Sequence, residues 1–308
     1  MCFSNIARVW YCQTPEASVT ESMGEHMQYA VAPTEELIDP VYQFEGDANV
    51  WSDWHKLATL VKHLTRRHLA ARYRSSALGF VWTLLNPVLL MGVYTFVFCV
   101  IFRTAVPGIP YPVFFLTGVL AWNFVSIAAM NAAVSLVDGT ALLNKAAFPR
   151  IALPLSAVLS SGVNYLMTLP LVLTFNMLFG IVPTFSLLLL PCALLLLLLV
   201  AIGVGLLLAA LMPFFRDLQH LIEVLFTMWL FLTPVLYPMS LVKQNLPAAL
   251  LPVYALNPMV GTIHLVHTVF LGQPLPRTSV AIAIGGGLCL LSLGFWIFQR
   301  LAMRVSEL

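Results

Sequence analysis

The residues with the clearest binding chemistry are four arginines that lie close together in the sequence: Arg66, Arg67, Arg72 and Arg74. A guanidinium group is planar and donates paired hydrogen bonds, so it suits a phosphate or diphosphate. These arginines belong to residues 54–74, where apolar side chains share one arc of a helix at about 100° per residue. That arc consists of Trp54, Leu57, Leu60, Val61 and Leu64. An amphipathic helix of this kind lies in the headgroup plane, so we expect an anion site at that level, with a generic positive-inside anchor as the alternative.

A short polar segment, residues 138–150, could dock a soluble partner. Phe148 has little reason to face water unless it packs on something, and Pro149 fixes how the chain leaves the segment. Lys145 and Arg150 flank this pair. A docking knob is one interpretation, and a helix-hairpin loop with an interfacial aromatic residue is the other.

A second polar segment contains Arg216 and Asp217. Asp217 suits the first turn of the helix that follows, because a carboxylate favours a helix N-terminus. Glu223 lies deeper, where a charge is costly, up to roughly 3 kcal/mol at full depth. We favour a structural ion pair of Glu223 with Arg216 or Lys145 over a proton relay.

Aromatic residues recur throughout the apolar segments. Most of them would face lipid or pack inside the protein. A few that stack along a conduit would let sugar rings slide past, since a pyranose face is apolar. The candidates for such a path are Trp82, Tyr94, Trp122, Trp229 and Tyr237.

Several chemical motifs are missing from the sequence. Without a G-x-x-x-x-G-K-[ST] loop, we expect no ATP site on this chain, and H-E-x-x-H and G-x-S-x-G are absent too. The five cysteines are scattered without a C-x-x-C pair, which predicts neither a disulfide framework nor a zinc site. His264 and His267 are the one enzyme-like pair, and packing is the favoured explanation for them. We expect no catalytic residue, metal or cofactor on the chain.

The composition indicates a membrane protein. The chain is 60% hydrophobic and 9% charged, whereas a soluble domain has roughly 25% charged residues. The basic residues lie at the edges of apolar segments, which favours membrane lipid and excludes nucleic acid as a partner. Residues 1–50 lack helical periodicity and predict a flexible cytoplasmic extension. We recognise no signal peptide, and Met23 or Met27 could be the true start.

A spanning helix needs about 20 mostly apolar residues. The sequence therefore predicts an all-α polytopic membrane protein, with an amphipathic helix in residues 51–80 and six spans in residues 81–308. The spans are expected at 82–102, 113–136, 151–179, 185–211, 221–239 and 279–299. Prolines interrupt residues 240–278, so the pieces at 246–256 and 258–271 are too short to cross, and we expect re-entrant or interfacial helices there.

Lysine and arginine set the orientation of such a protein. Many of them lie between Lys56 and Arg74, and others follow the second, fourth and sixth expected spans. The opposite face carries only Arg103, Lys243 and Arg277. We therefore expect both termini in the cytoplasm.

Five ordered motifs add to this pattern. They are Arg72-Tyr-Arg with Leu78-Gly79-x-x-Trp82 and Asn86-Pro87, then Phe148-Pro149-Arg150, Phe215-Arg216-Asp217, Thr233-Pro234-Val-x-Tyr237-Pro238 and Asn257-Pro258. Residues 51–308 thereby resemble the permease subunit of ABC exporters for polysaccharides and polyol phosphates. Members of that family carry lipid-linked O-antigen, capsule or teichoic acid chains.

The resemblance implies a homodimer in the bacterial inner membrane, with two copies of a separate cytoplasmic ABC ATPase that binds ATP and Mg. It implies that residues 54–74 are the family's interface helix and that residues 240–278 form two outer gate helices. The lipid diphosphate would be recognised near the basic helix, and the glycan would pass along the dimer seam. The residues that it implies for coupling to the ATPase are Lys145, Phe148, Pro149 and Arg150, with Arg216 and Asp217 at a second contact.

Two other functions remain open from the sequence. The cargo could be teichoic acid, a drug or a small lipid, because related permeases share the six-span plan. Outside this class, the chain could be a membrane-embedded acyl or glycosyl transferase that uses His264 or His267. Such an enzyme would need no ATPase.

Overall fold

The structure is a computed structural model that describes residues 54–74, 81–103, 106, 108–140, 149–182, 184–215 and 217–302. The chain divides into two units, Met1–Gln43 and Phe44–Leu308. Every described residue belongs to the second unit, so the extension expected at residues 1–50 lies outside the described part.

Within these ranges the regular secondary structure is helical, apart from an isolated bridge between Val106 and Ile109. The first half contains α2 (Trp54–Arg74), α3 (Val81–Thr95), the π-helix η2 (Phe96–Ile101), α4 (Tyr111–Asp138) and α6 (Ala152–Leu178). The second half contains η3 (Phe185–Leu189), α7 (Leu190–Leu211), η4 (Met212–Phe214), α8 (Leu218–Phe231), α9 (Met239–Asn245), α10 (Leu251–Ala255), α11 (Pro258–Leu271) and α12 (Arg277–Ala302).

Five described helical segments are long and apolar enough to cross a membrane: Leu84–Ile101, Tyr111–Asp138, Ala152–Leu178, Phe185–Phe214 and Arg277–Leu301. They agree with five of the six expected spans to within a few residues. The sixth, 221–239, differs, because α8 ends at Phe231 and has 14 residues, fewer than the usual minimum for a span. The helix stops there because Pro234 has no N–H to donate and disfavours helical backbone at the residue before it. A count of six spans stays a prediction.

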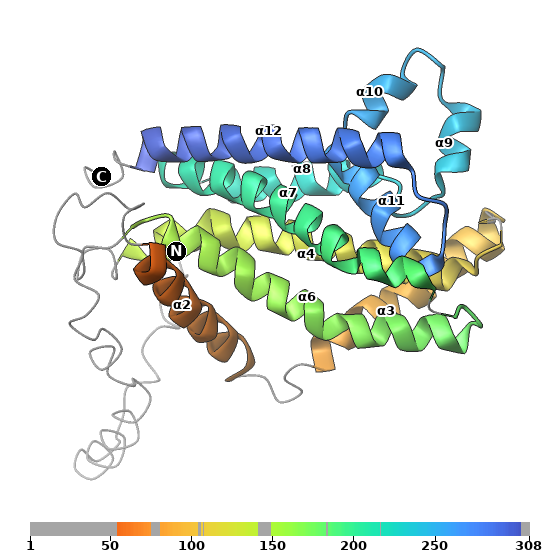
Figure 1. Ribbon diagram of the computed structural model, residues 1–308, viewed down its shortest axis with the longest axis horizontal. Coiled ribbons are helices and arrows are strands. Elements are labelled where there is room, and N and C mark those ends of the chain that lie inside the picture. Colours follow the sequence, from red (N-terminus) through yellow and green to blue (C-terminus); the bar gives the residue numbers. More distant parts are fainter. Residues whose placement is uncertain are drawn as a thin grey trace, which may run out of the picture. The chain divides into compact units, whose positions relative to one another are not determined.

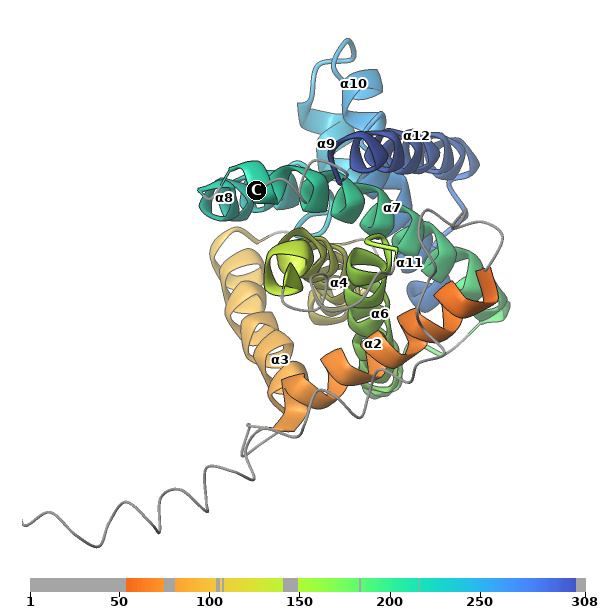
Figure 2. The ribbon, with the colours of Figure 1, turned by 90° about the vertical axis from the view of Figure 1, so that its left-hand side faces the viewer.

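Helix α4 is the centre of the packing and contacts α6, α7 and α11. In the end-on view of Figure 2, α4 and α6 lie inside, while α3, α8 and α12 lie around them. Ala128, Ala129, Ala132 and Ala133 on α4 are fully buried. Small side chains of this kind let neighbouring backbones approach closely, which is how helices associate within a membrane.

Helices α7 and α12 run side by side (Figure 1) and approach each other at the level of the backbone. A Cβ atom on Gly203 would lie 2.7 Å from the backbone nitrogen of Leu291. A Cβ atom on Gly294 would overlap the carbonyl oxygen of Gly203. The contact between the two helices therefore requires glycine at both positions.

Helix α2 lies at the end of the bundle where α4 ends and α6 begins, and it contacts α6 (Figure 1). Its bounds agree with the predicted helix at 54–74. Val61 and Leu64 are buried against apolar side chains of α4, α6, α7 and α12. Part of the apolar arc thus packs on the protein itself, while Trp54 stays exposed. The position of α2 in the headgroup plane stays a prediction.

The proline-interrupted region forms three short helices, α9, α10 and α11, and Asn257 ties the last of them to α8. Its Oδ1 accepts hydrogen bonds from the backbone nitrogen of Met259 (3.0 Å) and from Nε1 of Trp229 (2.9 Å). Its Nδ2 donates to the Leu232 carbonyl oxygen and to Thr233 Oγ1, both at 3.1 Å. The Asn-Pro motif therefore caps α11 and holds the chain that leaves α8. Whether these helices are re-entrant stays a prediction.

Candidate functional site

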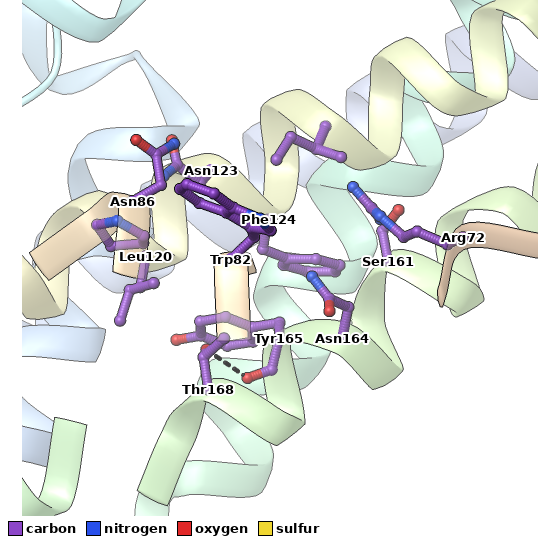
Figure 3. A pocket seen from close by; sticks show the side chains of 12 residues that line it. Arg72, Trp82, Asn86, Leu120, Asn123, Phe124, Ser161, Asn164, Tyr165 and Thr168 are labelled. Atoms are coloured by element: carbon purple, nitrogen blue, oxygen red, sulfur yellow. Dashed lines mark hydrogen bonds between the residues drawn. The ribbon is translucent and has the colours of Figure 1, made fainter. Parts of the chain in front are cut away.

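A cavity of about 250 Å³, which we call the amide cavity, lies between α3, α4 and α6 beside the end of α2 (Figure 3). Its lining residues are Arg72, Trp82, Asn86, Pro87, Leu120, Asn123, Phe124, Ile127, Ser161, Asn164, Tyr165 and Thr168. Three asparagines, a serine and a threonine in the wall of one cavity are unusual between apolar helices, because a polar group without a partner is costly there.

A second cavity of about 580 Å³, which we call the basic cavity, opens between α2, α4 and α6. Its polar lining residues are Arg67, His68, Arg72, Asn131, Ser135, Asp138 and Ser160. Arg72 lines both cavities. Asn131 of the basic cavity donates a hydrogen bond from Nδ2 to Ser161 Oγ of the amide cavity at 3.1 Å. The two cavities are therefore neighbours, joined by one guanidinium and one side-chain hydrogen bond.

Helical spacing explains why the two cavities follow each other. On α4 the polar side chains Asn123, Asn131, Ser135 and Asp138 recur at intervals of three, four or eight residues, which places them on one face. The stretch from Asn123 to Asp138 rises about 22 Å along the helix. On α6 the facing row consists of Ser160, Ser161, Asn164, Tyr165 and Thr168. We call these two rows the polar track; its signal in the sequence is amides and hydroxyls at helical spacing, and we did not predict it.

The electrostatics of the basic cavity are mixed. Burial lowers the pKa of His68, the positive charge of Arg67 lowers this pKa further, and Asp138 partly opposes the shift. Arg67 and Arg72 supply positive charge near one carboxylate, Asp138. The charge of this cavity therefore favours an anionic group on the side of the two arginines.

The structure separates the four arginines that we predicted to bind an anion. Arg72 lines both cavities and Arg67 lines the basic cavity alone. Arg66 is exposed and lines neither. Arg74 is the last residue of α2, and its side chain lies outside the described part. Arg72 is thus the arginine best placed to contact a ligand that enters the track.

The predicted coupling residues are described only in part. Pro149 and Arg150 are half-buried just before α6, and Asp217 precedes α8 at its N-cap position. Lys145, Phe148 and Arg216 lie outside the described residues. The proposed ion pair of Glu223 with Lys145 or Arg216 therefore stays a prediction.

The five aromatic residues predicted to line a path do not share one surface. Trp82 lines the amide cavity. Tyr94 stacks on Phe115, with ring centroids 4.7 Å apart. Trp122 and Trp229 meet edge to face at 5.4 Å between α4 and α8. Tyr237 lies at the other end of the bundle, where its hydroxyl donates a hydrogen bond to the Phe231 carbonyl oxygen.

A groove of about 370 Å³ separates α4 from α8, and Glu223 lines it together with Trp122 and Ile127. Ile127 also lines the amide cavity, so α4 has a cavity on each side. Glu223 is exposed. Its carboxylate therefore faces this groove and is not packed in the core.

The two histidines are held in a packed environment. His267 is 1% exposed, and its ring lies 4.2 Å from that of Phe114. A Cβ atom on Gly118 would lie 3.1 Å from its Nε2, so α4 packs closely against this buried nitrogen. The Nδ1 atom of His264 is also buried, without a hydrogen-bond partner in the described part of the chain. This enclosure favours packing over catalysis. Among the described residues, no group of three His, Cys, Asp or Glu side chains could hold a metal ion.

Together these features define a class: a multi-pass helical membrane protein with a polar track between its central helices. A sequence model described as ABC-2 type transporter matches residues 59–271. The chain is 36% identical over 248 residues to the O-antigen export system permease protein RfbA of Myxococcus xanthus, which covers 80% of this chain and 89% of that protein. It is 28% identical over 253 residues to an O-antigen export system permease protein RfbA of Klebsiella pneumoniae, over 82% of this chain and 95% of that one. The chain belongs to the ABC-2 type transporter family.

Proposed function

We propose that this chain is the membrane permease of an ATP-driven exporter that moves a lipid-linked polysaccharide across the bacterial inner membrane. The observation that carries the proposal is the similarity, over most of both chains, to permeases named for O-antigen export. The polar track supports it, because the polar head of a lipid-linked glycan needs hydrogen-bonding groups between the apolar helices. Teichoic acid, a small lipid or a drug would each need a different lining, either more cationic or more apolar.

The permease works as a homodimer with two cytoplasmic ATPase subunits, as the family resemblance implies. We place the α2 end of the bundle in the cytoplasm, because the basic residues of α2 gather there with Arg150 and Arg300. The opposite end carries Arg103, Lys243 and Arg277. In this orientation the basic cavity opens at the inner headgroup level, and α9 and α10 lie on the outer side.

The lipid diphosphate is bound by Arg67 and Arg72, with Arg66 and Arg74 attracting it to the surface. The ATPase contacts the segment that contains Lys145, Phe148, Pro149 and Arg150 and transmits its movement to the permease there. Arg216 and Asp217 form the second contact. ATP and Mg stay on the ATPase. The movement of its subunits rocks the permease at the dimer seam.

The test is co-purification with the ATPase candidate encoded nearby, followed by ATPase and export assays. We expect a stable complex for the wild type and loss of assembly or coupling in the double variant Phe148→Ala with Arg150→Ala. The control is Lys243→Ala, an exposed basic residue on α9, which should leave both unchanged. If the protein purifies without any ATPase and a deletion strain still exports its glycan, the proposal fails.

A further inference from the structure

The amide cavity contains more hydrogen-bonding capacity than a diphosphate can use. Among the described residues, the side-chain amides of Asn86 and Asn123 make no hydrogen bond, and both face the cavity. An amide offers two donors and an acceptor with two lone pairs. A diphosphate has only acceptors, so it would leave the acceptor oxygens of these amides unused. The lining instead matches a ligand that carries both donors and acceptors, such as a set of sugar hydroxyls.

The aromatic residues of the cavity fit the same ligand. The rings of Phe124 and Tyr165 stack with centroids 5.3 Å apart and planes 16° apart, which makes one continuous apolar wall. Trp82, which is 51% exposed, adds a third ring. In Figure 3 the rings of Trp82 and Phe124 lie between the amides of Asn86 and Asn123 and the guanidinium of Arg72, and the ring of Tyr165 lies below them. A pyranose ring has apolar C–H faces and polar edges, so it pairs with an aromatic wall and amides together.

Charge separates this cavity from its neighbour. Of the described residues that line the amide cavity, Arg72 alone is charged, whereas the basic cavity has Arg67, Arg72 and Asp138. A neutral group is therefore favoured in the amide cavity and an anion on the Arg67 side of Arg72. The volume, about 250 Å³, suits a single sugar ring and not an oligosaccharide.

From these observations we propose that the amide cavity is a subsite for one neutral sugar ring, the ring bonded directly to the lipid diphosphate, whose phosphate contacts Arg72. This inference rests on the proposed function, because it takes the cargo to be a lipid-linked glycan. It adds that recognition of the first sugar occurs inside one subunit, between α3, α4 and α6. Asn86 on α3 and Asn123 on α4 then contact the sugar from two sides and determine which first sugar is accepted.

The experiment measures binding of two lipids to the complete permease–ATPase complex in nanodiscs. One probe is undecaprenyl diphosphate, and the other is undecaprenyl diphosphate bearing a single N-acetylglucosamine. For the wild type we expect the sugar-bearing lipid to bind more tightly. Asn123→Ala should weaken binding of the sugar-bearing lipid by about tenfold, because one or two hydrogen bonds are lost. Binding of the sugar-free lipid should change by less than about twofold.

Two comparison variants make the result specific. Arg72→Ala should weaken the binding of both lipids by a similar factor, because it removes the diphosphate contact. Asn245→Ala, an exposed asparagine on α9, should change neither. Thermal unfolding of each variant complex checks that it is folded.

Equal affinity of the wild type for the two lipids would overturn the inference while leaving the export function intact. An equal loss for both lipids in Asn123→Ala would overturn it as well, since the residue would then act on structure or on the diphosphate. If neither lipid binds the wild type and no ATPase partner is found, the proposed function itself has failed. The outcomes therefore distinguish the two failures.

Discussion

Helices α3 and α4 are both apolar, yet the protein uses them in opposite ways. In the membrane-length stretch of α4, 78% of the residues are buried inside the chain, whereas in Leu84–Ile101, which includes most of α3, the share is 6%. Helix α8 resembles α3, with Ile222 and Phe226 as its buried residues. The central helix α4 thus buries most of its residues inside the chain, whereas the outlying helices α3 and α8 present their apolar faces to lipid or to another chain.

This difference bears on the cavities. The amide cavity lies between α4 and α3, and the Glu223 groove lies between α4 and α8. Each hollow therefore has one wall on the packed core and one on a loosely held helix. A shift of α3 or α8 would reshape the hollow without unpacking α4, α6, α7 and α12.

The largest expected effect is in the core, at the contact of α7 with α12. Gly294→Ala forces a Cβ atom onto the carbonyl oxygen of Gly203, so we expect a loss of about 3 kcal/mol in the free energy of unfolding. Gly285→Ala, on the same helix with open space around it, should be neutral or stabilise by about 0.5 kcal/mol. Thermal unfolding in detergent measures both. Equal effects would show that α12 is not packed on α7 as described.

A pair of leucines tests the contrast between α4 and α3. Leu136 on α4 is 0% exposed and Leu89 on α3 is 58% exposed. Leu136→Ala leaves a cavity and should cost about 2 kcal/mol, whereas Leu89→Ala should stay within about 0.5 kcal/mol. The measurement is unfolding of the isolated chain in detergent. A large loss for Leu89→Ala would mean that α3 is covered by a second chain in the micelle.

A smaller effect is expected where α8 is tethered. Asn257→Ala removes the hydrogen bonds to Trp229, Leu232 and Thr233, so we expect a loss of about 1.5 kcal/mol. Asn245→Ala removes one exposed bond to the Leu241 carbonyl oxygen and serves as the control. Protease sensitivity of the segment after α8 gives a second measurement, which should rise in Asn257→Ala alone.

The smallest expected effect concerns pH. Because burial and Arg67 lower the pKa of His68 in the folded protein, the unfolded chain binds a proton first as the pH falls below about 6.5. Stability should therefore decrease as the pH drops through that range. His68→Gln should flatten this part of the profile, with His55→Gln on the same helix as the control. An unchanged slope in His68→Gln would show that the shift at this site is absent.

Part of the site was predictable from residue type alone. Arg72 and Trp82 were expected to take part, and the structure brings both to the amide cavity. The partners Asn123, Ser161 and Asn164 were not recognised, although polar residues recur at helical spacing in both apolar segments. Their meaning depends on two helices that face each other, which no single stretch of sequence reveals.

The aromatic residues show what residue type alone does not specify. Trp122 and Trp229 were grouped with Trp82 because they share its chemistry, but they meet each other between α4 and α8. Side-chain chemistry does not specify which face of a helix is turned to which neighbour. Packing of the whole bundle decides that.

By itself the sequence determined the helical membrane class, the bounds of the helix at 54–74 and five of the spans, since these follow from local runs of apolar residues and from prolines that end helices. It also placed the basic residues at the α2 end. Only the tertiary structure decided that Val61 and Leu64 pack on the bundle and that two polar rows on α4 and α6 enclose a cavity. These features arise from contacts between residues far apart in the chain, whose free energy depends on how neighbouring helices approach.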